Sequence, residues 1–156
     1  MLREARRAAR ERRVVNADWI RGSSTQLREL EPAPGGFDLV TIGTAFHFME
    51  PRATLAELRR ITNGGVAVVY NGTPMWLHPD PWARALRAVL ESRLGPVADV
   101  DFTADALRVA EHEMRDLGYV EVERWEYVHD ETIDAEFVAG HILSATSIDQ
   151  IPHAER

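Results

Sequence analysis

The 156-residue chain contains no cysteine and no lysine, and it has no long run of apolar residues. Without cysteine it cannot form a disulfide, a zinc–thiolate site, an iron–sulfur site or a cysteine nucleophile. Without lysine it has no Schiff-base lysine and no P-loop lysine. The longest apolar candidate, residues 65–70, is strand-sized and far below the roughly 18 residues of a membrane-spanning helix. No apolar stretch follows the N-terminal charges, so no signal peptide is predicted and a cytoplasmic location is expected.

The remaining composition is that of an ordinary folded domain, with 45% hydrophobic and 28% charged residues. Charge is distributed unevenly. Residues 1–13 carry six arginines and two glutamates, a net charge of +4, while the rest carries twelve arginines and twenty-three acids, a net charge of -11. The overall charge of -7 argues against a nucleic-acid partner, and nothing in the sequence indicates a membrane partner.

Hydrophobic periodicity and turn signals predict an alternation of helices and strands, which indicates an α/β fold. The predicted elements are a helix at 2–13, strands at 14–20, 37–43 and 66–70, helices at 52–62, 82–94 and 103–117, a strand at 120–127 and a last helix after Thr132. The apolar run at 37–43 is typical of a parallel strand covered on both faces. It is expected to pair in parallel with the strand at 66–70, because the helix at 52–62 links the two by a right-handed crossover.

The spacing of apolar residues also predicts which side of each helix packs inward. In the helix at 52–62 the inward residues are Leu55, Leu58 and Ile61, and the outward ones are Arg52, Arg59 and Arg60. In the helix at 82–94 one side carries Trp82, Leu86, Val89, Leu90 and Leu94, and in the helix at 103–117 the inward residues are Leu107, Ala110, Met114 and Leu117.

Local signals place the ends of these elements. Asn63, Gly64 and Gly65 are expected to terminate the helix at 52–62, because such residues adopt the positive φ of a C-cap. Thr103 and Thr132 are expected to cap the helices that follow them. A shift in the apolar phase near Arg124 predicts a bulge in the strand at 120–127.

The segment after the strand at 37–43 is the strongest candidate for chemistry. In open α/β sheets, ligands bind at the carboxyl ends of the strands, and this strand delivers Thr44, Ala45 and His47 to that edge. Gly43 has no side chain, so a ligand can approach the backbone there. Two interpretations of His47 stay open: a base or polar contact to substrate, or a histidine packed among aromatic side chains with one backbone hydrogen bond.

Other candidates are weaker. His112 and Asp116 have the i, i+4 spacing of metal ligands, but no third ligand is spaced with them, so a salt bridge is favoured and no metal site is predicted. Ser23 and Ser24 do not lie in a nucleophile elbow and have no evident His/Asp partners, which argues against a hydrolase.

The segment FDLVTIGTAFHFM, followed by a helix, the NGG turn and the strand VAVVY, resembles the fourth and fifth motifs of class I S-adenosylmethionine-dependent methyltransferases. The similarity is greatest to the small-molecule "methyltransferase type 11" group, with AFHF and NGG here where that family often has AFHW and PGG. Upstream, VVNADWIRGSSTQL resembles the family's third strand and adenine-side turn, with Ser23 where many members have an acid. Downstream, LGY and VEVERWEY resemble its late helix and strand.

This resemblance implies a Rossmann-like, mostly parallel sheet, S-adenosylmethionine as cofactor and a small-molecule methyl acceptor. It implies that Gly22, Ser23 and Ser24 line the adenine side of the cofactor. Gly43, Thr44 and Ala45 would line the methyl side, and His47 would face the acceptor as the catalytic residue.

The family's glycine-rich first motif and the acid after its second strand are not found, and the chain has no Gly-x-Gly sequence. We therefore expect a single, N-terminally truncated domain without the family's first two strands. Residues 1–72 would form its cofactor side and residues 73–156 its helical, lid and C-terminal part. Methyl transfer would be impaired, and unpaired strand edges would favour self-association. Two alternatives remain: a non-catalytic half-domain or interaction module completed by another chain, and an inactive gene fragment.

Overall fold

The computed structural model describes residues 2–31, 35–97, 99, 101–128 and 132–145. The chain forms two compact units, Met1–Val69 and Tyr70–Arg156. The architecture is mixed α/β, with one two-stranded sheet in the described residues. The elements are α1 (Leu2–Glu11), η1 (Ser24–Glu29), β1 (Phe37–Gly43), η2 (Phe46–Phe48), α2 (Pro51–Ile61), β2 (Thr62–Val69), η3 (Met75–Leu77), α3 (Pro81–Leu94), α4 (Phe102–Asp116) and α5 (Ala135–Ala145).

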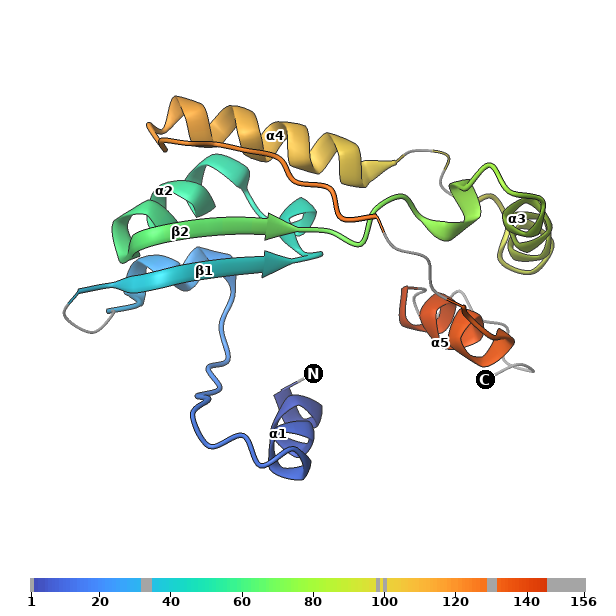
Figure 1. Ribbon diagram of the computed structural model, residues 1–156, viewed down its shortest axis with the longest axis horizontal. Coiled ribbons are helices and arrows are strands. Elements are labelled where there is room, and N and C mark those ends of the chain that lie inside the picture. The colour runs from blue at the N-terminus through green and yellow to red at the C-terminus, as the bar shows by residue number, and fades with distance from the viewer. Residues whose placement is uncertain (1, 32–34, 98, 100, 129–131, 146–156) are drawn as a thin grey trace. The chain divides into compact units, whose positions relative to one another are not determined.

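The centre of the first unit is a β1–α2–β2 motif (Figure 1). The two strands pair in parallel, from Leu39 opposite Gly65 to Gly43 opposite Val69. Parallel neighbours cannot be joined by a tight turn, and α2 forms the crossover between them. The predicted strands at 37–43 and 66–70 are therefore confirmed as adjacent and parallel.

Helix α2 has the signals of a stable start and an amphipathic body. Pro51 occupies the first turn, and the side chain of Glu50 accepts a hydrogen bond from the amide of Ala53 at 2.6 Å. The inward side chains expected from the sequence are buried in the structure: Leu55, Leu58 and Ile61. They form the core of this unit together with Ile42, Phe46 and Thr54.

The sheet is not covered on both faces, so that part of the prediction is wrong. Side chains alternate between the two faces of a strand. On β1, Ile42 is buried, whereas Leu39 keeps 61% of its surface exposed. Helix α2 packs against the sheet and accounts for the covered face. A continuous apolar run therefore does not show how many faces of a strand are covered.

The Asn63-Gly64-Gly65 sequence does not cap a helix. Helix α2 ends at Ile61, and β2 begins at the next residue, so the three residues lie inside a strand. A side chain at Gly64 would overlap the carbonyl oxygen of Asp38 on β1. Glycine is required at position 64 because the backbones of the two strands approach closely there. Close backbone approach, and not a helix cap, therefore explains this glycine.

Two predicted strands are absent. Residues 14–20 and 120–127 lie within the described residues, and neither range forms a strand. Most of their apolar side chains are exposed, including Val15 at 94% and Trp125 at 85%. A strand requires a neighbour that pairs with its backbone donors and acceptors, and alternation in the sequence does not supply one.

In its described residues, the second unit contains helices and no strand. In α3, the buried side chains are Ala83 and Leu90, whereas Trp82 and Val89, predicted to face inward, are about half exposed. In α4, Ala110 and Met114 are buried as predicted, and Gly118 adopts a φ of 77° just beyond the helix end.

The predicted threonine caps are replaced by aspartates. The Asp101 carboxylate accepts hydrogen bonds from the amides of Thr103 at 3.0 Å and Ala104 at 3.4 Å. Asp134 accepts one from the amide of Phe137 at 2.8 Å. Both residues stand immediately before their helices, where a carboxylate also interacts favourably with the helix dipole.

Side-chain contacts connect α3 and α4 to the chain around them. Arg87 of α3 donates hydrogen bonds to Asp99 at 2.7 Å and Glu91 at 2.9 Å. These two bonds, the one to Asp99 foremost, raise the pKa of the Arg87 guanidinium above its ordinary value. Thr103 of α4 donates its hydroxyl to the carbonyl oxygen of Gly72 at 3.1 Å.

Candidate functional site

The candidate site is built at the carboxyl end of β1. The amide of Thr44 donates a hydrogen bond to the carbonyl oxygen of Val69 at 2.8 Å, which extends the β1–β2 pairing by one residue. Thr44 has a φ of 46°, in the left-handed region that residues other than glycine seldom adopt. Backbone strain of this kind is concentrated at functional sites and turns. Here it turns the chain away from the sheet immediately after Gly43.

The next residues form the short helix η2, which is anchored by one aromatic ring. Phe46 is 1% exposed and belongs to the core, whereas Phe48 is 82% exposed. The amide of Met49 donates to the carbonyl oxygen of Phe46 at 3.0 Å and closes the turn. The buried ring fixes a loop on which His47 and Phe48 are exposed.

His47 lies on this loop as an exposed residue. Its ring centroid is 3.8 Å from that of Phe48, with an angle of 49° between the ring planes. The imidazole therefore has an aromatic neighbour and is also accessible to a small molecule, so neither interpretation of His47 is excluded. It is the titratable side chain of residues 43–49, so proton transfer at this edge would depend on it.

Gly43, Thr44, Ala45 and His47 thus lie together at the carboxyl end of the parallel pair. A Cβ placed on Gly43 would meet no atom within 4 Å, so there is open space beside the strand end. The predicted role of Gly43, close approach of a ligand to the backbone, fits this geometry.

Gly22, Ser23 and Ser24 lie at the start of η1, and no strand precedes them in the described residues. The polar atoms of Ser23 have local partners. Its hydroxyl is 2.8 Å from that of Thr25, and its amide donates to the side-chain oxygen of Gln26 at 3.0 Å. A ligand at Ser23 would compete with these bonds.

Arg60 of α2 holds η1 in place. Its guanidinium donates to the carbonyl oxygens of Leu27 at 3.1 Å, Arg28 at 3.4 Å and Leu30 at 3.4 Å. Helical spacing predicts only that Arg60 lies on the outer face of α2. An arginine on an exposed helical face carries no sequence signal that distinguishes a solvated side chain from one that binds distant carbonyl groups.

The histidine and aspartate with metal-like spacing contact each other within α4. Nε2 of His112 lies 3.4 Å from a carboxylate oxygen of Asp116, one turn along α4. Among the residues that the structure describes, no group of three or more histidine and carboxylate side chains could hold a metal ion. The same described part of the chain contains no helix with the length and apolar character needed to cross a membrane.

Comparisons of this chain with protein-family models, with curated proteins and with solved structures found no match.

Proposed function

We propose that the chain carries the acceptor-side part of a Rossmann-like, S-adenosylmethionine-dependent methyltransferase site that acts on a small molecule. The observation that carries the proposal is the β1–α2–β2 unit, with Gly43, Thr44 and Ala45 at its carboxyl edge. Ligands of open parallel sheets bind at that edge. The motif resemblance over residues 37–70 gives the class of chemistry, and the parallel pairing is the arrangement that this resemblance requires.

The residues at this edge suit methyl transfer. S-adenosylmethionine supplies an activated methyl group when bound, so the protein's task is to align donor and acceptor and to exclude water. The open space at Gly43 accommodates a methyl group close to the backbone. His47, exposed one turn later, is placed to hold the acceptor or to accept its proton.

The same residues do not make a complete cofactor site. The chain has no Gly-x-Gly loop whose amides would bind the methionyl carboxylate. Each missing charge-assisted hydrogen bond is worth about 1.5–3 kcal/mol. Losing several of them moves a micromolar dissociation constant to about 1 mM or weaker. We therefore expect the isolated chain to bind the cofactor weakly, at the edge of β1.

A nuclear magnetic resonance titration of the labelled chain with S-adenosylmethionine tests this. The amide signals of Gly43, Thr44 and Ala45 should shift without saturating below about 1 mM. Gly43→Val fills the open space and should abolish the shifts. Thr41→Val, a β-branched residue two positions earlier on the same strand, should leave them unchanged.

Two results would contradict the proposal. Shifts that spare residues 43–45, or that disappear equally in both valine variants, would show that the cofactor does not bind at the carboxyl end of β1. A one-to-one calorimetric isotherm in the micromolar range would show that the chain builds a complete cofactor site from other residues.

A half-domain completed by another polypeptide is the second candidate. The exposed Leu39 and Val69 favour it, because the sheet has two strands in the described part of the chain and two strands alone are marginally stable. In that case a polypeptide supplying a glycine-rich strand–turn–helix should bind in a one-to-one ratio and raise the affinity for S-adenosylmethionine. Association without any gain in cofactor affinity would favour a purely non-catalytic module.

A further inference from the structure

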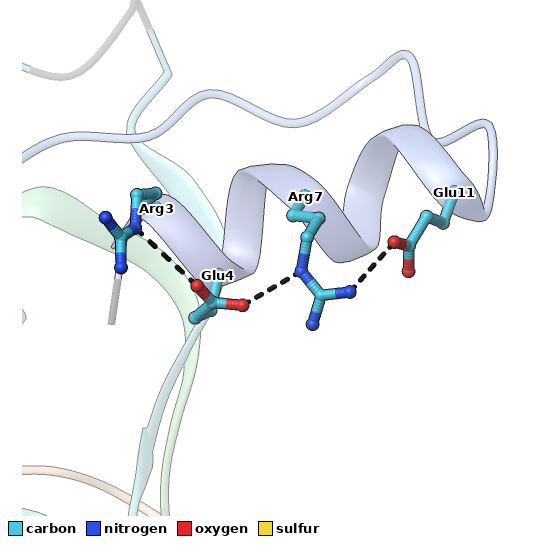
Figure 2. A network of polar contacts seen from close by, with 4 residues as sticks. All are labelled: Arg3, Glu4, Arg7 and Glu11. Carbon is cyan, nitrogen blue, oxygen red and sulfur yellow. Dashed lines mark hydrogen bonds and ion pairs between the residues drawn. The ribbon is translucent and has the colours of Figure 1, made fainter.

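The surface of α1 is divided into three stripes. Leu2, Ala5 and Ala9 share one side of the helix by their spacing. Figure 2 shows the second stripe, on which acidic and basic side chains alternate along the helix. The third stripe holds Arg6 and Arg10, four residues apart and therefore neighbours on one face.

Only one of the two charged stripes is neutralised. On the mixed stripe, Arg7 bridges Glu4 and Glu11 at 2.9 Å each, and Arg3 lies 3.6 Å from Glu4. On the arginine stripe, Arg6 donates to the neutral carbonyl oxygen of Trp19 at 3.3 Å. Arg10 has no acidic partner within the described residues. The excess positive charge of residues 1–13 is therefore concentrated on one face of α1 and just beyond its end.

The apolar stripe of α1 is only half-buried. None of its ten residues is buried. Isolated helices shorter than about 12–15 residues are marginal in water, and most helices in proteins are stabilised by packing. A surface that binds the arginine face would supply the missing stabilisation.

A complementary surface lies on the same chain, at residues 120–127. Val120, Trp125 and Tyr127 are 84–88% exposed on a segment that forms no strand. Glu121 and Glu126 are exposed between them. Carboxylates beside aromatic rings are the groups that a guanidinium binds best, by bidentate hydrogen bonds and by stacking on a ring face.

We propose that α1 of one copy binds residues 120–127 of a second copy. Arg6 and Arg10 pair with Glu121 and Glu126, and a guanidinium stacks on Trp125. The two copies exchange this contact reciprocally, so a closed dimer satisfies both surfaces of each chain. The dimer does not depend on the proposed methyltransferase site and uses neither strand of its sheet.

Charge and composition favour a second copy over other partners. The chain outside residues 1–13 carries a net charge of -11, which repels nucleic acid and attracts the basic helix of another copy. The apolar stripe of α1 contains a single large side chain, Leu2, which is too little to insert into a lipid surface.

Sedimentation velocity of the full chain tests the proposal. The wild-type chain should form a dimer that weakens when the salt concentration is raised from about 50 mM to about 500 mM, because exposed charge pairs are screened. The double variants Arg6→Glu/Arg10→Glu and Glu121→Arg/Glu126→Arg should each raise the dimer dissociation constant at least about tenfold. In an equimolar mixture of the two variants, a mixed dimer has one contact with the original charges and one with exchanged charges. Both contacts are then between opposite charges, so the dissociation constant should return close to the wild-type value.

A matched control separates specific pairing from net charge. Arg28→Glu/Arg59→Glu makes the same change in charge on exposed residues outside α1, and it should leave the dimer unchanged. Circular dichroism confirms that each variant keeps its helix content. A wild-type chain that stays monomeric at all concentrations would overturn the proposal. So would a control variant that dissociates the dimer equally, or a mixture of the two reversed variants that does not associate.

Discussion

Gly64 of β2 and Asp38 of β1 approach each other so closely that no side chain fits at position 64. The pairing register is interrupted at the same place. Phe37 lies opposite Thr62 and Leu39 opposite Gly65, so Asp38 faces two residues of β2. This is a β-bulge at the start of the parallel pair, and bulges of this kind bend a strand and increase its twist.

Replacing Gly64 with alanine should destabilise the first unit by about 1–3 kcal/mol, because the added methyl group forces the two backbones apart. Gly65→Ala is the matched control, since its Cβ would lie 3.4 Å from the terminal carbon of Leu39 and needs little adjustment. Urea unfolding of both variants measures the difference. Equal stability of the two variants would show that the close approach at Asp38 does not constrain the sheet.

The parts of the fold that the sequence predicted correctly are those determined by local periodicity. Leu55, Leu58 and Ile61 follow the spacing of one helical face, and they are buried as that spacing predicts. The parallel pairing of 37–43 with 66–70 followed from two apolar runs joined by a helix of suitable length. In these cases the information needed lies within about thirty consecutive residues.

The parts that failed depend on distant neighbours. Residues 14–20 and 120–127 have the composition of strands, but pairing requires a second strand with free donors and acceptors. At the candidate site, the position of Gly43 and Thr44 at the strand end could be predicted. The left-handed backbone of Thr44 could not, because threonine gives no signal for a positive φ.

Arg60→Ala should loosen η1 without unfolding α2. The guanidinium binds the carbonyl oxygens at the end of η1, which have few other partners at a helix end. Because the side chain is about half exposed, we expect a loss of only about 1 kcal/mol, or roughly fivefold faster amide exchange in residues 24–29. Arg59→Ala removes a neighbouring exposed arginine and should leave that exchange unchanged. Unaltered exchange in Arg60→Ala would contradict the assigned role.

Asp101→Ala should destabilise α4 by about 1–2 kcal/mol, because two helix amides lose their side-chain acceptor. The variant also removes the acceptor of the Thr73 hydroxyl, which lies 2.9 Å from the second carboxylate oxygen. Asp101→Asn keeps an oxygen acceptor and should retain most of the stability. Thermal unfolding followed by circular dichroism compares the two. A loss that is as large in the asparagine variant would assign the effect to the charge instead of the cap.

The adjacent aromatic residues of η2 should respond in opposite ways to truncation. Phe46 is 1% exposed, so Phe46→Ala leaves a cavity and should cost about 3–5 kcal/mol. Phe48 is 82% exposed, and Phe48→Ala should leave the free energy of unfolding nearly unchanged.

Because Phe46 anchors the loop that carries Thr44 and His47, its replacement should also broaden or shift the amide signals of residues 43–48. Phe48→Ala should affect only its immediate neighbours. Urea unfolding and nuclear magnetic resonance spectra of the two variants measure both effects. If Phe46→Ala left the spectrum of residues 43–45 intact, the strand end would hold its conformation through the Thr44–Val69 hydrogen bond alone, and the buried ring would have no part in shaping the site.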